Sequence, residues 1–173
     1  VTMAKDYGGD RMVEQMSQPY ADVKKKVEAM KASGKYSEVE MTSNGGIYAV
    51  EKGKARHKPE EKEAAKHMAK AGYQVTLKDE TGQVRTPDGK VFSFTFEQRT
   101  PNTGGARTVL KAMEHARRKP ADVVVIYDKH SVYHRNVIEH GIALYEQHIS
   151  NYRFKRIIVI SKSGNVYEHS HNL

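Results

Sequence analysis

The sequence predicts an α/β protein in which a mixed central sheet is flanked by helices. Segments with helical spacing of apolar residues alternate with segments of strand pattern, in the order α-ββ-α-β-β-α-β-α-β-β. Two apolar runs, ADVVVIY and KRIIVIS, have the composition of strands buried on both faces. A helical pattern lies between these two runs, which favours a parallel crossover.

The first elements are a predicted helix and a β-hairpin. Residues 1–35 contain a segment with helical apolar spacing that ends at Gly34. Residues 36–53 alternate on both sides of Asn-Gly-Gly at 44–46, which accepts the positive φ of a tight turn. We therefore expect residues 1–35 to form an N-terminal helical extension and residues 36–173 to form the main domain.

The remaining elements follow from the same patterns. The helix that begins at Pro59 has acids in its first turn and ends at Gly72. KVFSFTFEQ keeps a strict period of two, which is typical of one continuous strand. Further predictions are a strand at 73–77, helices at 104–119 and 134–152, and an edge strand at 165–169.

Composition excludes some classes of protein and favours others. The 173 residues have a formal charge of +8, and residues 56–173 hold twenty Lys and Arg against thirteen Asp and Glu. A polyanionic partner fits this basic segment, as does an ordinary solvated surface. The absence of cysteine excludes disulfides, thiolate metal sites and thiol catalysis. No apolar run approaches the ~20 residues that span a bilayer, so we expect no membrane partner.

The stretch PDGKVFSFTFEQR, at residues 87–99, places two acids and a cation close together in the chain. On a single strand, Glu97 and Arg99 share a face because side chains alternate. Asp88 lies in the turn before that strand, and its carboxylate reaches Glu97 if the turn folds back. Glu61 lies on the inner rim of the preceding helix. We therefore expect the three acids and Arg99 to converge on one site.

Such a group of acids suits a divalent metal ion, Mg²⁺, Mn²⁺ or Zn²⁺, with Glu61, Asp88 and Glu97 as ligands. A metal held in this way polarises a scissile phosphate and lowers the pKa of the water that attacks it. Each residue also fits an ordinary role. Glu61 interacts favourably with a helix dipole, Asp88 before glycine is a turn former, and Glu97 with Arg99 makes an exposed strand pair.

Polar donors beside these acids are candidates for nucleic-acid binding. Thr100, Thr103 and Arg107 gather at the start of the helix that follows Arg99, and His57 precedes the acid-bearing helix. The same loop equally fits an ordinary helix cap.

These residues carry a resemblance to a known family. A helical acid, PDG and FEQR, followed by a helix and a strand, resemble the PD-(D/E)xK nuclease superfamily, which has the restriction-endonuclease-like fold. The runs EKEAAKHMAKAGYQVTL, TPDG, FSFTFEQRT and RTVLKAMEHARRKPADVVVI are similar to the C-terminal tRNase domain of contact-dependent growth inhibition toxins and to related phage head-morphogenesis proteins. The likeness covers residues 36–168.

The resemblance implies a metal-dependent nuclease acting on RNA, including tRNA, with an acidic immunity protein as inhibitor. It also implies a segment of a longer secreted toxin or phage protein that acts in a bacterial cytoplasm, which a first residue of Val1 fits. The departure from the pattern is Arg99, where the superfamily has lysine. Arginine keeps the charge but does not place a compact donor at the same point. A working variant, an inactivated protein and a domain that only binds all remain open.

Two other functions are compatible with the sequence. A metal-free, barnase-like toxin RNase would use His57 or His134 for acid–base chemistry, in a fold with helices first and an antiparallel sheet last. A basic module without catalysis would bind nucleic acid or another protein, for example inside a phage particle.

Overall fold

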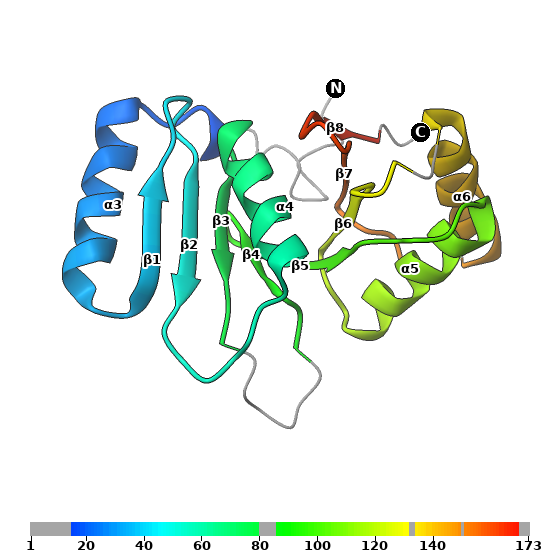
Figure 1. Cartoon of the computed structure of the whole chain (residues 1–173), viewed down its shortest axis with the longest axis horizontal. Helices are drawn as coiled ribbons and strands as arrows, with labels where there is room; N and C mark the ends of the chain where they lie inside the picture. Colours follow the sequence, from blue (N-terminus) through cyan, green and yellow to red (C-terminus); the bar gives the residue numbers. More distant parts are fainter. Residues whose placement is uncertain (1–14, 80–85, 132–133, 150, 170–173) are drawn as a thin grey trace.

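The computed structural model describes residues 15–79, 86–131, 134–149 and 151–169 (Figure 1). Its helices are α3 (Tyr20–Ser33), α4 (Pro59–Lys70), α5 (Ala106–Arg118) and α6 (Arg135–His148). Its strands are β1 (Tyr36–Met41), β2 (Ile47–Glu51), β3 (Gln74–Leu77), β4 (Gly89–Val91), β5 (Phe94–Arg99), β6 (Val123–Tyr127), β7 (Arg156–Ile160) and β8 (Val166–Glu168).

The eight strands form one mixed sheet in which their spatial order is their order in the chain. The pairs β2–β3, β5–β6 and β6–β7 are parallel, and a helix connects the two strands of each. The other pairs are antiparallel. The α/β class with a mixed sheet is thus confirmed, as are the buried strands β6 and β7 and the crossover between them.

The sequence prediction was wrong about KVFSFTFEQ, which is two strands. The chain turns back at Phe92 and Ser93, so that β4 and β5 form an antiparallel hairpin with Val91 opposite Phe94. Phe92 has a φ of 53°, in a region that glycine or asparagine normally supplies, so no turn signature marks this position. Alternation holds within each strand, but Val91 and Phe94 share a face of the sheet, where a single strand would have placed them on opposite faces.

One face of the sheet packs on α4, and the sheet curls around this helix. Tyr48 and Val50 of β2 and Ile158 and Ile160 of β7 belong to the same buried cluster as Met68 of α4, although four strands separate β2 from β7. Figure 1 shows α4 in front of the middle of the sheet. The curl therefore encloses the largest of the three buried clusters against a single helix.

The opposite face is covered at its two ends and polar between them. At one end α3 packs on β1 and β2 through Val23 and Val27, while residues 1–14 of the expected N-terminal extension lie outside the described residues. At the other end α5 and α6 pack on β6 and β7. The strand register places a strip of polar side chains on this face between α3 and α5: Gln74, Thr76, Lys90, Thr95 and Glu97.

The position of α5 over the sheet depends on its close contact with α6. A Cβ added at Gly141 of α6 would lie 2.5 Å from the Cβ of Val109 and 2.7 Å from the carbonyl oxygen of Ala106. Glycine therefore lets the two helices approach at this point. In the interior of a helix, glycine is otherwise less favourable than alanine by about 1 kcal/mol.

We predict that Gly141→Ala destabilises the protein by about 1–3 kcal/mol, because overpacking outweighs the helix propensity of about 1 kcal/mol that alanine would add. Chemical denaturation measures the change. The matched control is Gln147→Ala on the exposed side of α6, which we expect to leave the free energy of unfolding nearly unchanged. A Gly141→Ala variant more stable than the parent would contradict the close helix contact.

Candidate functional site

The hairpin of β4 and β5 brings Asp88 and Glu97 together. Its register pairs Gly89 with Phe96, so the residues one step further, Asp88 and Glu97, lie opposite each other on one face. Gly89 permits this arrangement because a Cβ there would lie 2.2 Å from the carbonyl oxygen of Thr76 on β3. Asp88 and Glu97 thus lie side by side, but the chain reverses at Phe92 and Ser93 and not in a turn at Asp88, as the sequence had suggested.

Reciprocal hydrogen bonds fix both carboxyl groups. The amide of Asp88 donates to Oε1 of Glu97 at 3.2 Å, and the amide of Gln98 donates to Oδ2 of Asp88 at 2.8 Å. Both residues are buried, with 2% of Glu97 and 4% of Asp88 exposed. Two acids that are buried side by side repel each other when both are ionised.

Two side chains from the C-terminal end of α5 contact the second oxygen of Glu97. Nζ of Lys119 lies 3.0 Å from Oε2, and Nε2 of His115 lies 3.4 Å from the same atom. Lys119 directly follows α5 and His115 lies one turn earlier, so both reach the sheet from one side. The site therefore combines two acids from a hairpin with two basic side chains from a helix.

The electrostatics of the site favour a proton on Glu97. Burial, and next the charge of Asp88, raise the pKa of Glu97 to about 8, while Lys119 acts in the opposite direction. A hydrogen bond between the two carboxyl groups also favours the protonated form. Burial, and then the charges of Arg99 and Lys119, lower the pKa of His115, so this imidazole is neutral at neutral pH.

The other predicted residues lie in different places. Glu61 pairs with His57, whose Nδ1 is 3.1 Å from Oε2 of Glu61 and whose side chain is 4% exposed. Thr103 contacts Thr108 through their hydroxyl oxygens at 3.4 Å, and Arg107 is exposed in the first turn of α5. Within the described ranges, no three His, Asp or Glu side chains form a set able to hold a metal ion. The three-acid metal site stays a prediction.

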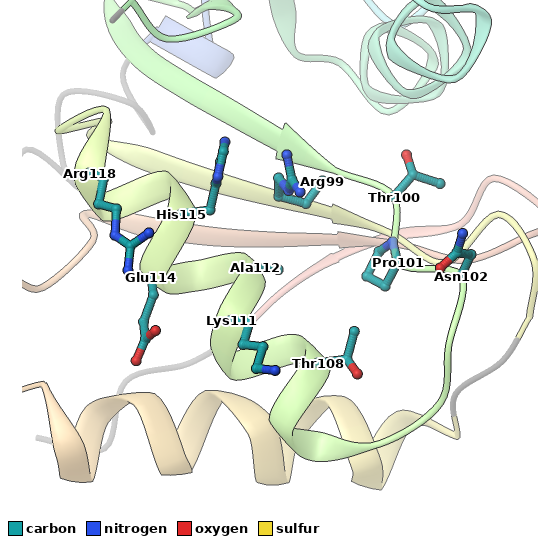
Figure 2. Close-up of a pocket in the computed structure, with 10 residues that line it drawn as sticks. All are labelled: Arg99, Thr100, Pro101, Asn102, Thr108, Lys111, Ala112, Glu114, His115 and Arg118. Carbon is teal, nitrogen blue, oxygen red and sulfur yellow. The ribbon is translucent and has the colours of Figure 1, made fainter.

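A cleft of about 590 Å³ adjoins the acid pair. Figure 2 shows Arg99 and Thr100 at the end of β5 and His115 and Lys111 on α5, four of the residues that line this cleft. The lining consists of Arg99, Thr100, Pro101, Asn102, Thr108, Lys111, Ala112, Glu114, His115 and Arg118. Two predicted residues, Arg99 and Thr100, thus line a common cleft.

Sequence reasoning missed His115 and Lys119. The cation was sought two residues after Glu97, on the strand, whereas the ion pair comes from the end of the next helix. The available signal was the i, i+4 spacing of His115 and Lys119 on a helix that must cross back over β5 to reach a parallel strand. That spacing alone does not say which strand residue they meet.

Comparisons with known proteins bear on the fold. No family model matches the sequence, and no curated protein matches it. The structure is similar to a chain from the CdiA-CT/CdiI toxin and immunity complex of Burkholderia pseudomallei, with a TM-score of 0.56 and 22% sequence identity over 70% of this chain and 98% of that chain. The expected likeness to a contact-dependent growth inhibition toxin is thus matched at the level of fold. Among the described residues, no helix is long and apolar enough to cross a bilayer.

We predict that Glu97 makes the metal-free protein less stable as pH rises. Unfolded glutamate has a pKa of about 4.3, so the raised pKa of Glu97 means that the folded state holds the proton more tightly. The resulting stability is present in acid and is lost as pH rises through about 8, by up to about 1.4 kcal/mol per pH unit.

Chemical denaturation in EDTA, at pH values from the unfolded pKa of about 4.3 to the folded pKa of about 8, measures the effect. Glu97→Gln should remove this part of the slope, whereas Glu28→Gln on the exposed side of α3 should keep it. Equal slopes for Glu97→Gln and the parent would show that Glu97 ionises normally.

Proposed function

We propose that the protein is a metal-dependent nuclease of PD-(D/E)xK type that hydrolyses RNA, and that it serves as the toxic domain of a contact-dependent growth inhibition system. The observation that carries this proposal is the buried pair of Asp88 and Glu97 on adjacent strands, each oriented by a backbone amide of the other strand. The element order α4-β3-β4-β5-α5-β6 supports it, because the resemblance requires a helix before the acids and a helix–strand pair after them.

The residues present fit Mg²⁺ or Mn²⁺ better than Zn²⁺. Asp88 and Glu97 offer hard carboxylate oxygens, and Mg²⁺ is commonly bound by one or two carboxylates together with waters and substrate phosphate. A catalytic Zn²⁺ site usually has three protein ligands, often histidine, and the described residues contain no such set. A divalent cation bound there would polarise the scissile phosphate and acidify an attacking water.

Lys119 is the residue we assign to the role of the superfamily lysine. Its ammonium lies 3.0 Å from Glu97, so it can orient a water or neutralise charge on a phosphate held at the acid pair. His115, neutral at neutral pH, can exchange a proton or donate a hydrogen bond beside it. The function therefore does not require a lysine at position 99.

The fold is the basis on which we choose between the alternative enzymes and between a toxin and a phage protein. A barnase-like RNase has an antiparallel sheet at its end, whereas β5, β6 and β7 are parallel here. The structural match comes from a toxin and immunity complex, which favours a toxin over a phage particle. We accordingly propose an acidic immunity protein as the natural inhibitor, since charge complementarity would speed its capture of a basic toxin.

We predict that the wild-type protein cleaves RNA with Mg²⁺ or Mn²⁺ and stops in EDTA. Asp88→Asn, Glu97→Gln and Lys119→Met should each lower cleavage by about 100-fold or more, because each removes a charge needed in the transition state. Arg99→Lys should preserve or raise the rate. A gel assay with labelled tRNA gives the rates, and circular dichroism verifies that each variant is folded.

The competing functions give different results in the same assay. Cleavage that persists in EDTA and in Asp88→Asn but disappears in His57→Ala or His134→Ala would favour the metal-free RNase. Binding of RNA without cleavage, by both wild type and Arg99→Lys, would favour a module that only binds.

A further inference from the structure

The cleft beside the acid pair is lined by several cationic side chains. Arg99, Lys111 and Arg118 are exposed and line the cleft, and none of them pairs with a carboxylate in the part of the chain that the structure describes. Among the described lining residues Glu114 is the one carboxylate, so permanent positive charges there outnumber negative ones three to one.

Two of these cations, Arg99 and Lys111, lie in a direction that leads away from the acid pair. His115 contacts Glu97 and also lines the cleft, so the two sites share a wall. Arg99 lies two residues beyond Glu97 on the same side of β5, about 7 Å along the strand. Lys111 lies one helical turn from His115 along α5, about 6 Å further on. A chain of negative charges that starts at the acid pair would therefore meet one cation after another.

Neutral donors complete the lining. Oγ1 of Thr100 accepts a hydrogen bond from Nε2 of Gln98 at 2.6 Å, which leaves the hydroxyl proton of Thr100 available to an acceptor in the cleft. Asn102 and Thr108 add an amide and a hydroxyl. Among the residues that the structure describes, the lining contains no Phe, Tyr or Trp on which a base could stack, so its chemistry suits a sugar-phosphate backbone.

We propose that this cleft binds the sugar-phosphate backbone of the RNA strand on one side of the scissile phosphate. The inference rests on the proposed function, because the acid pair defines which phosphate is cleaved. Arg99 then contributes its positive charge to a neighbouring phosphate, together with Lys111 and Arg118 of α5, which line the same cleft. The cleft contributes affinity that does not depend on sequence, since phosphate contacts carry none of the information in the bases.

Binding of RNA by a non-cleaving protein tests the proposal. The parent is Asp88→Asn in EDTA, and the probe is a fluorescein-labelled single-stranded RNA followed by anisotropy over about 50 to 200 mM salt. In this parent, Lys111→Gln and Arg118→Gln should each reduce the slope of log K against log salt by about 0.7, and the double variant by about 1.4. The charge-matched control is Lys24→Gln at an exposed position of α3, and the affinity and slope of this variant should equal those of the parent.

A double variant that binds RNA with the slope and affinity of the Lys24→Gln control would overturn the proposal. This result is separable from a failure of the proposed nuclease, which is assayed with Asp88 intact and metal present. If the slope falls as expected while the wild-type protein never cleaves RNA, the cleft is a nucleic-acid site and the nuclease assignment is wrong. If wild type cleaves and the slope is unchanged, the nuclease stands and the substrate follows another surface.

Discussion

The site depends on a turn of two residues between β4 and β5. Because the chain reverses at Phe92 and Ser93, acids nine positions apart become direct neighbours in the sheet. Each carboxyl group then accepts a hydrogen bond from a backbone amide on the opposite side of the hairpin, so the hairpin itself holds the orientation of both carboxyl groups. The same arrangement concentrates negative charge in a buried place, and Lys119 offsets only part of it. Geometry and electrostatics of the site thus have one common origin.

Helix packing determines what faces these acids. The close contact of α5 with α6 at Gly141 sets the position of α5 over the sheet, and α5 brings His115 and Lys119 to Glu97. The same helix carries Lys111 and Arg118, whose side chains line the cleft. A single element therefore supplies basic groups both to the acid pair and to the surface beside it, while the strands supply the acids.

Periodicity predicted the order of elements because most of them are long enough to show a clear pattern. The exception was the turn at Phe92, where a positive φ is held without glycine, asparagine or proline, so nothing local marked it. The pairing of Asp88 and Glu97 could be anticipated, since it needed only a chain that folds back nearby. The contact of Lys119 with Glu97 joins a helix end to a strand, and such a contact depends on packing that one sequence does not reveal.

The sequential order of the strands has a consequence for how the chain folds. Every strand pairs with the one that precedes it in the chain, so no connection has to cross another strand and no segment has to be threaded into a sheet already formed. Contacts of short sequence separation cost little loop entropy and form quickly. The sheet can grow outward from any one hairpin or crossover, and a chain unfolded completely can recover its architecture by adding neighbouring strands one after another.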